Sequence, residues 1–515
     1  MSTSTLIRTS PSILRLDPSD PIGVAVKDLA QGDATGIDGV AAQAGIPKGH
    51  KVALRAIARG EAVRKLGTVI GQASAPIKAG EHVHTHNLAF RPSAASRTVT
   101  ASRRNRRAPI EDGAASFEGY VREGGRVGTR NVLVVLCTVN CSATVAKRIA
   151  ETFRRTVDLN PYPTIDGVVA LTHAHGCSVR ANGPGMDSLR RTLGGYAQHP
   201  NVAGVLVVGL GCEDNQIDEF LARAGLQPSP RLKALVIQEE GGTAATIAAG
   251  VEALKDMLPS AAAARRRPVP ASRLLVGLQC GGSDGFSALT ANPALGAAVD
   301  LLVEQGGGAI LSETPEIYGA EQLLLERVAS REVGDKLVEL LGWWERNARL
   351  DAGDLNANPS PGNKAGGITT ILEKSLGAVA KAGSSVLEGV YAYAEPINVP
   401  GLVFMDSPGS DAVSATGQVA AGANLICFTT GRGSCFGAAP VPSLKLATTT
   451  GLYERMRGDM DLNCGTILDG TETLVGAGRR IFNLMLETAS GKRTRSEELG
   501  YGEEEFVPWT PGLIY

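Results

Sequence analysis

Four cysteines of this 515-residue chain share similar surroundings, since each follows an apolar run by a few residues and stands beside glycine or a polar residue. They are Cys141, Cys177, Cys212 and Cys280. Ligands of open α/β sheets bind beyond the carboxyl ends of the strands, so we expect these thiols to meet at one edge of a sheet. Thiolates are soft ligands that suit iron or zinc, and the set is therefore a candidate metal site. Packing is the simpler explanation for any one of them alone, because free cysteine is often a core residue.

Five of the seven histidines fall in two short motifs, HVHTHN and HAHGC. The first motif alternates His82, His84 and His86, and alternate side chains of a strand share one face. Three imidazoles on one face predict a metal site or an acid–base cluster, with a solvated edge strand as the simpler alternative. His173 and His175 repeat the alternation directly before Cys177.

Two glycine-rich segments could bind anions, namely 359–367 (PSPGNKAGG) and 430–433 (TGRG). Lys364 and Arg432 supply positive charge within them. Neither segment is a phosphate-binding G-x-x-x-x-G-K-[ST] loop, and no G-x-G-x-x-G follows a strand. These absences argue against a nucleotide-dependent oxidoreductase.

The predicted elements that would position these residues follow two different sequence patterns. Residues from about 20 to 90 contain short β-prone runs between polar and Gly/Pro turns, which predicts a small β domain. The Arg-, Ser- and Ala-rich segment that follows has no apolar period, which indicates a flexible linker. Its basic cluster at 102–107 leaves contact with RNA or an acidic partner as a minor alternative.

From residue 119 onward, strands that are apolar throughout alternate with helical segments, which predicts a parallel sheet covered on both faces. The predicted strands lie at 131–136, 166–171, 202–208, 274–278, 308–311, 401–404 and 425–428. A second break is expected at 261–270, where alanine-rich sequence passes into three arginines and a proline. The pattern does not decide whether 116–515 forms one body or two.

Bulk composition excludes several classes of protein. Hydrophobic residues make up 43%, charged residues 20% and aromatic residues 4%, with a formal charge of -1, which is typical of a soluble enzyme and offers no field for nucleic acid or a membrane surface. The amino terminus lacks the apolar core of a signal peptide, and no apolar run approaches membrane-helix length. We therefore expect a cytoplasmic protein with reduced thiols.

Several long motifs resemble the altronate/galactarate dehydratase family over nearly the whole chain. They are 82–87 (HVHTHN), 124–131 (GGRVGTRN), 209–216 (GLGCEDNQ), 280–293 (CGGSDGFSALTANP), 358–370 (NPSPGNKAGGITT) and 428–433 (FTTGRG). The resemblance implies an α/β protein with an N-terminal β-clip (SAF-like) domain at 18–90 and a linker at 91–115. It also implies a large Rossmann-variant body with a mainly parallel sheet, which we divide at 116–260 and 271–515. A homodimer and a reaction that depends on Fe2+ are further implications.

The implied reaction converts an aldonic or aldaric acid to its 2-keto-3-deoxy product. The HVHTHN motif resembles the altronate branch of the family, whereas 461–470 (DLNCGTILDG) resembles the galactarate branch, so both sugar acids are candidates. A related sulfolactate sulfo-lyase has the same architecture in separate chains, and its reaction is the alternative. A non-enzymatic carbohydrate-binding protein is the more distant rival.

One mechanism is consistent with these residues. A ferrous ion at the strand ends would stabilise the ene-diolate as a Lewis acid, while His173 removes the α-proton and His84 or His86 protonates the departing hydroxyl. The expected metal ligands are Cys177, Cys212, Cys280 and Cys141, with Asp284 and Glu213 as alternatives. The expected substrate-binding residues are Arg130, Lys364, Arg432 and Asn87. An iron–sulfur cluster on the same cysteines, or another divalent cation, remains open.

Overall fold

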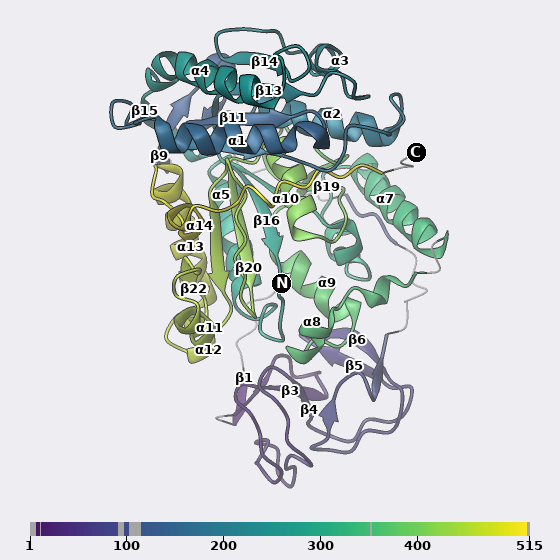
Figure 1. The fold of residues 1–515 in the computed structure, drawn as a ribbon. Coiled ribbons are helices and arrows are strands. Elements are labelled where there is room, and N and C mark those ends of the chain that lie inside the picture. The colour runs from purple at the N-terminus through teal and green to yellow at the C-terminus, as the bar shows by residue number, and fades with distance from the viewer. Residues whose placement is uncertain (1–6, 11, 91–96, 102–114, 351–352, 512–515) are drawn as a thin grey trace.

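A computed structural model describes residues 7–10, 12–90, 97–101, 115–350 and 353–511. Three bodies follow one another along the molecule (Figure 1): a small β domain at one end, a body built on a seven-stranded sheet in the middle, and a domain built on a four-stranded sheet at the other end. None of the helices described has the length and apolar character that crossing a membrane requires.

The N-terminal β domain contains two small sheets, as the short β-prone runs predicted. Strand Ile22–Ala25 and strand Lys51–Ala53 are buried throughout, so apolar residues of both strands form the core of the domain. The five-stranded sheet has the order β1 (Ile7–Ser10), β2 (Ile13–Arg15), β3 (Ile22–Ala25), β4 (Lys51–Ala53), β7 (His82–Val83). The three-stranded sheet has the order β5 (Ala62–Lys65), β6 (Thr68–Ala73), β8 (Leu88–Ala89).

Part of the predicted linker packs against the body. Arg97 makes ion pairs with Glu321 and Glu345, at 2.8 and 2.7 Å, and Ala101 forms a parallel β-bridge with Val328. Residues 97–101 therefore differ from the flexible linker that we expected, because charge pairing and a backbone bridge hold them. The basic cluster at 102–107 lies outside the described residues.

The seven-stranded sheet is parallel throughout and forms the centre of the molecule. Along β20 (Leu425–Thr430), Leu425 and Cys427 face helices α5 (Ala291–Glu304) and α13 (Leu474–Ala489), whereas Ile426 and Phe428 face α10 (Asp411–Ala420), so both surfaces of the sheet are buried. The strands are β18 (Leu387–Tyr391), β19 (Gly401–Met405), β17 (Gly308–Leu311), β16 (Leu275–Cys280), β20 (Leu425–Thr430), β21 (Ser443–Ala447), β22 (Leu462–Asn463). The covering helices are α5 (Ala291–Glu304), α13 (Leu474–Ala489) and α10 (Asp411–Ala420). The predicted mainly parallel sheet is confirmed.

The four-stranded sheet is a second parallel sheet. Its strands are β12 (Gly167–Leu171), β11 (Val132–Cys137), β13 (Val202–Gly209), β14 (Leu232–Val236). Helices α1 (Asn140–Thr156) and α4 (Thr243–Ala262) cover one face, and α2 (Pro184–Ala197) and α3 (Ile217–Arg223) cover the other. Because α2 also packs on α10, one apolar core runs from this sheet into the seven-stranded sheet.

The two crossings between these bodies lie side by side. Strand β9 (Ser116–Val121) leads into the four-stranded domain and pairs antiparallel with β15 (Arg266–Pro270), which leads out of it; β10 (Val127–Gly128) completes this sheet. The predicted break at 261–270 therefore falls where the chain changes bodies, but its residues form the end of α4 and a paired strand.

The remaining helices surround the middle body, and α8 and α9 lie closest to the β domain (Figure 1). They are α6 (Gln322–Leu325), α7 (Arg331–Leu350), α8 (Pro361–Ala365), α9 (Ile371–Ala380), α11 (Thr450–Arg455), α12 (Thr466–Asp469) and α14 (Arg495–Leu499). The 3-10 helices are η1 (Glu123–Gly125), η2 (Ala271–Arg273), η3 (Thr314–Ile317) and η4 (Leu355–Ala357).

A buried ion group joins the β domain to the middle body. Lys51 and Lys65 of the β domain hold the Glu373 carboxylate of α9 at 2.9 and 2.7 Å, and all three side chains are almost fully buried. Lys51 also donates to the carbonyl oxygen of Gly367 at 2.6 Å. Burial alone would raise the pKa of Glu373, but the two ammonium groups lower it to about 2. The carboxylate therefore stays ionised at neutral pH.

We predict that Glu373→Gln destabilises the protein by about 3–5 kcal/mol, because it leaves two buried lysines without a counter-charge. The shift of the urea unfolding midpoint measures this effect. Glu61→Gln, which removes an exposed pair with Arg55, is the matched control and should cost less than about 1 kcal/mol. Since the pKa of Glu373 is depressed in the folded state, its contribution is present above pH 4.5 and is lost as the pH falls toward 2. Equal midpoints for the two variants would contradict this role.

Candidate active site and metal centre

A cavity of about 330 Å³ opens at the carboxyl edge of the seven-stranded sheet. It lies where β16 ends at Cys280, beyond the last residues of β19 and β20. Its lining includes Cys280, Gly281, Gly282, Ser283, Glu316, Asn358, Ser360, Gly362, Asn363, Lys374, Gly409, Asp411 and Arg432. This is the position at which parallel α/β sheets bind their ligands.

A larger groove of about 1000 Å³ lies at the opposite edge of the same sheet, between the seven-stranded body and the four-stranded domain. It contains the start of β16 at Leu275, the start of β17 at Gly308 and several arginines, but Asp187 is its only carboxylate among the described residues. Size alone does not make it the active site. The smaller cavity combines carboxylates, ammonium groups and strand ends, which acid–base chemistry requires.

Charged side chains meet in the smaller cavity. Lys374 donates to Glu316 at 2.5 Å and to the amide oxygen of Asn358 at 2.6 Å. Asp411, the first residue of α10, points toward Gly281 on the opposite wall, where an added Cβ would lie 2.1 Å from its Oδ2. Burial, helped by the charge of Glu316, raises the pKa of Asp411 to about 6. A carboxyl group that titrates near neutrality suits proton transfer.

At the floor of the cavity lies a buried group made of Cys280, Glu313 and Glu316, whose sulfur and oxygen atoms are within 4.8 Å of one another; Cys280 and Glu316 line the cavity itself. Lys381 donates to Cys280 Sγ at 3.0 Å and lies 3.9 Å from Glu313 Oε2. With Lys374 on Glu316, two ammonium groups already hold the places that a cation would need. We therefore assign this group to charge balance under the cavity and not to a metal.

Glu313 is strained as well as buried. Its φ of 72° lies in the left-handed region, and neither carboxylate oxygen has a hydrogen-bond partner among the described residues. Ser407 holds it in place, because its hydroxyl accepts from the backbone of Glu313 and its carbonyl accepts from the backbone of Thr314. Burial, reinforced by Glu316, raises the pKa of Glu313 well above its usual range. Strain of this kind is concentrated at functional sites.

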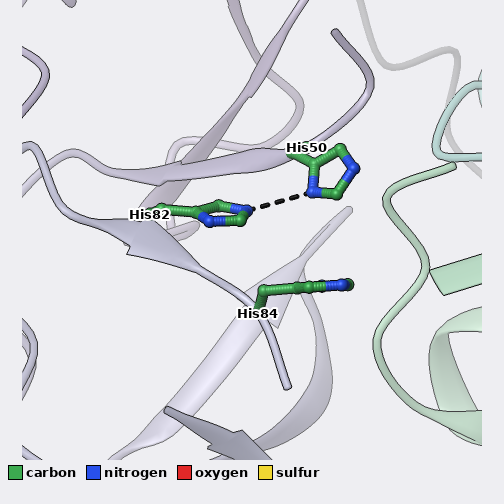
Figure 2. A group of neighbouring side chains, drawn as sticks. All are labelled: His50, His82 and His84. Carbon is green, nitrogen blue, oxygen red and sulfur yellow. Dashed lines mark hydrogen bonds between the residues drawn. The ribbon is translucent and has the colours of Figure 1, made fainter. Parts of the chain in front are cut away.

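Three histidines of the β domain form a compact cluster that faces the middle body (Figure 2). His50 Nδ1 lies 3.0 Å from His82 Nε2, and the rings of His82 and His84 stack with centroids 5.4 Å apart. One ring nitrogen from each lies within 4.8 Å of the other two. The antiparallel pairing of β4 with β7 causes this arrangement, because its register continues from the Lys51–Val83 pair to set His50 opposite His84, with His82 diagonally across on the same face.

The segment 360–370 separates the histidine cluster from the cavity. On one side, Ser360 and Asn363 line the cavity, and they cap α8 by reciprocal side-chain bonds. On the other side, His50 Nε2 lies 3.1 Å from the carbonyl oxygen of Ala365, and His84 Nδ1 lies 3.0 Å from Thr369 Oγ1. The cavity and the cluster thus share one wall.

The histidines of the cluster are held in their neutral form. Burial, together with the neighbouring histidines and Lys51, lowers the pKa of His82 to about 3 and that of His84 to about 4. Neutral imidazole is the form that binds metal ions, and imidazole suits iron and zinc. The donor set therefore fits a divalent transition metal such as Fe2+.

Comparison with known proteins places the chain in a family. Profiles of the altronate/galactarate dehydratase SAF domain, the D-galactarate dehydratase/altronate hydrolase second domain and the D-galactarate/altronate dehydratase C-terminal domain match residues 11–91, 119–262 and 271–514. The altronate dehydratase of Bacillus subtilis (strain 168) is 36% identical over 495 residues, which cover 96% of this chain and 98% of that protein. The chain belongs to the altronate/galactarate dehydratase family.

Two further proteins that resemble this chain are named for different reactions. The galactarate dehydratase (L-threo-forming) of Escherichia coli (strain K12) is 37% identical over 499 residues, covering 95% of this chain and 94% of that protein. The (2R)-sulfolactate sulfo-lyase subunit beta of Chromohalobacter salexigens is 33% identical over 396 residues, covering 75% of this chain and 96% of the subunit. The predictions of a hydro-lyase and of an N-terminal SAF domain are thereby confirmed.

The HVHTHN motif of the family is a turn and not the continuous strand that we predicted. Strand β7 ends at Val83, and the backbone of His84 accepts from Asn87 and Leu88. Asn87, expected to bind substrate, uses its side chain to accept from the backbone of His84 and to donate to that of His82. It shapes the turn. His86 is exposed, with its ring centroid 5.5 Å from that of His82.

The three basic residues expected to bind substrate have different surroundings. Arg130 is buried, and its guanidinium is occupied by Glu497 and by backbone carbonyls, so it is a structural residue far from the cavity. Lys364 lies on α8 but does not line the cavity. Arg432 does line it.

The expected cysteine set is divided between two bodies. Cys280 ends a strand of the seven-stranded sheet, whereas Cys141, Cys177 and Cys212 follow strands of the four-stranded sheet, at the opposite end of the molecule from the SAF domain (Figure 1). A single edge cannot hold all four. The alternative ligands are also engaged elsewhere. Glu213 accepts hydrogen bonds in the four-stranded domain and Asp284 accepts them beside the cavity.

His173, expected as the base, is structural in this arrangement. Its Nδ1 accepts from the backbone of His175 at 3.2 Å, so its Nε2 donates to the carbonyl oxygen of Cys137 at 3.0 Å. Burial lowers its pKa to about 4. Both nitrogens are occupied, and the residue lies in the four-stranded domain, away from the cavity.

Sequence patterns missed several residues of the site. His50 stands outside both histidine motifs, and only the pairing of β4 with β7 brings it close to His82 and His84. Lys374 and Asp411 lie on helices and carry no distinctive spacing. Glu313 left a usable signal, since it follows strand β17 as closely as the cysteines follow theirs.

We predict that His82→Ala and His84→Ala each weaken binding of Fe2+ by at least tenfold, because each removes one of three imidazole donors. Anaerobic calorimetry with ferrous iron, or with Mn2+ as a stable substitute, measures the affinity. His175→Ala, which changes a half-buried histidine of the four-stranded domain, should leave the affinity of this site unchanged. Unaltered affinity in both cluster variants would exclude the histidines as ligands.

Proposed function

We propose that this protein dehydrates a sugar acid to a 2-keto-3-deoxy acid in the cavity at the carboxyl edge of the seven-stranded sheet. The observation that supports it most directly is the convergence of Asp411, Lys374 and Arg432 on a cavity that shares a wall with three neutral histidines. Its volume of about 330 Å³ suits a molecule of six carbons. The dehydratases among the relatives support the same reaction class.

We propose that His50, His82 and His84 hold Fe2+. When bound, such an ion would supply positive charge beside the wall that the cluster shares with the cavity, and a metal acting as a Lewis acid stabilises the negative charge that develops on a carboxylate as its α-proton leaves. We further propose that the enzyme works as a homodimer in the cytosol, where ferrous iron and free thiols persist.

The side chains of the cavity divide the proton transfers between them. Asp411, ionised above pH 6, removes the α-proton. Although burial opposes its charge, the neighbouring Glu316 raises the pKa of Lys374, so this ammonium group is protonated and donates to the departing β-hydroxyl. The two groups lie on α10 and α9, on different walls, as an elimination that moves two protons requires.

Arg432 is proposed to bind the substrate carboxylate. It lies on the loop after β20, its side chain is exposed at the cavity, and its backbone is fixed by a bond to the carbonyl of Gly282. A guanidinium binds a carboxylate through two parallel hydrogen bonds. Because Lys374 is committed to Glu316, Arg432 provides the one uncommitted positive charge among the described residues of the lining, which favours an acid with a single carboxylate, such as altronate, over a dicarboxylate.

Direct assay tests the function. The anaerobically purified protein, loaded with Fe2+, is incubated with altronate, galactarate and sulfolactate, and the keto acid or released sulfite is measured. Keto acid from altronate in larger amount than from galactarate supports the proposal and the single carboxylate. Sulfite from sulfolactate, with no keto acid from either sugar acid, would replace it with the sulfo-lyase reaction. No turnover of any of the three would refute it.

We predict that kcat/KM falls as the pH drops below about 6, because protonation of Asp411 removes the base. The charges that face Asp411 are those of Glu316, Lys374 and Lys381. Asp411→Asn should lower kcat by about 10²–10⁴-fold with little change in KM. Asp187→Asn, which changes an exposed carboxylate in the groove at the opposite edge, should behave as the wild type. An acid limb that persists unchanged in Asp411→Asn would assign the pH dependence to another group.

A further inference from the structure

Three thiols of the four-stranded domain remain without a role in the proposed reaction. Cys141, Cys177 and Cys212 are all exposed, which is unusual for cysteine, since this residue is commonly among the most buried. They follow β11, β12 and β13, which are adjacent in the sheet, so they share its carboxyl edge. None of the three thiols forms a hydrogen bond with another described residue.

Backbone and side-chain bonds tie the three loops together. Asn140, beside Cys141, donates its backbone amide to the carbonyl of His175, two residues before Cys177. The backbone amide of Asn215 then donates to the carbonyl of Gly176, and that of Ser178 donates to the Asp214 carboxylate, which joins the Cys177 loop to the Cys212 loop.

Glu213 links the remaining pair of loops. Its carboxylate accepts from Thr138 Oγ1 at 2.7 Å and from the backbone of Gly211 at 2.6 Å, so it joins the end of β11 to the end of β13. His173 fixes the third loop through its bond to the carbonyl of Cys137. The polar side chains of this edge thus bind one another and the backbone, and they leave the sulfur atoms available.

The backbone on either side of Cys177 is strained. Gly176 has a φ of 101°, and a Cβ there would lie 2.2 Å from the carbonyl oxygen of Thr138. Ser178 has a φ of 57°, which is rare for a residue with a side chain. Gly211, directly before Cys212, has a φ of 127° and packs against the side chain of Gln238. Such conformations persist where the surrounding structure holds a functional group in position.

The spacing of the sulfur atoms distinguishes two kinds of metal centre. Three thiolates on one tetrahedral ion, with bonds of about 2.3 Å, lie about 3.8 Å apart. Within the part of the chain that is described, the three cysteines are not among the groups whose ligand atoms all lie within 4.8 Å of one another. A four-iron cluster places its thiolates farther apart, because each binds a different iron. A single ion would therefore require the three loops to move closer together, whereas a cluster accepts a wider spacing of the thiolates.

We propose that Cys141, Cys177 and Cys212 bind a [4Fe–4S] cluster at the carboxyl edge of the four-stranded sheet, with one iron that has no protein thiolate. Cys141 is the second residue of the 17-residue helix α1, whose amino end favours the negative charge of an iron–thiolate group. The proposal is independent of the reaction assigned to the cavity, because the two sites lie in different bodies.

Anaerobic reconstitution with ferrous iron and sulfide tests this proposal on the full chain. We expect about four irons and four labile sulfides per chain beyond the iron of the histidine cluster, with the broad visible absorption of a cluster. Cys141→Ser, Cys177→Ser and Cys212→Ser should each lose most of the sulfide and the absorption. Cys435→Ser is the matched control, since Cys435 is an exposed cysteine of the middle body and its loss should change neither.

Two further measurements separate loss of the cluster from misfolding or from failure of the other iron site. In the wild type, the cluster should protect Cys141, Cys177 and Cys212 from alkylation, read by peptide mass spectrometry, while Cys435 stays reactive. His82→Ala should keep the sulfide and the absorption. Iron without sulfide, zinc in place of iron, equal alkylation with and without reconstitution, or a cluster that survives in Cys177→Ser would overturn the proposal.

Discussion

The buried contact of Lys51 and Lys65 with Glu373 holds the active-site region together. It attaches the β domain to α9 at the position where the histidine cluster must touch the segment 360–370. Two ammonium groups on one carboxylate are costly to desolvate, and their geometry has to be good to be tolerated. Such a contact specifies one orientation of the two bodies, since any other would leave buried charge without a partner. The alignment of cluster and cavity follows from it.

The balance between carboxylates and ammonium groups is the second feature on which the site depends. The cavity and the layer beneath it contain Glu313, Glu316 and Asp411 against Lys374 and Lys381. Repulsion between neighbouring carboxylates and their burial favour the protonated state for some of them, while the ammonium groups stay charged. A site of this kind can donate and accept protons near neutral pH without a charged group from outside the site. The strained backbone at Glu313 indicates that the fold sacrifices some stability to keep that carboxyl group in place.

Sequence patterns predicted the fold better than the site. Strands of a parallel sheet that are buried on both faces appear as apolar runs, so β11, β13, β17 and β20 were found within two residues of their ends. Strand β21 was missed because Lys445 interrupts its apolar run; this lysine is buried and donates to the carbonyl of Phe436. His82 and His84 were found through local spacing, but His50 was not, because strand pairing over long range is absent from local pattern. The cysteines were assigned to one edge because the sequence does not show which sheet a strand joins.

The antiparallel pairing of β9 with β15 has an evolutionary consequence. The polypeptide leaves the middle body and returns to it at neighbouring points. The segment between these points is therefore arranged like an inserted domain, which could be gained or lost as one unit without changing the path of the rest of the chain. This segment includes the apolar core between its sheet and helices α1 and α4, and a carboxyl edge with three exposed thiols. The packing of α2 on α10 anchors this segment to the middle body, so a change in the size of an apolar side chain on one helix requires a matching change on the other.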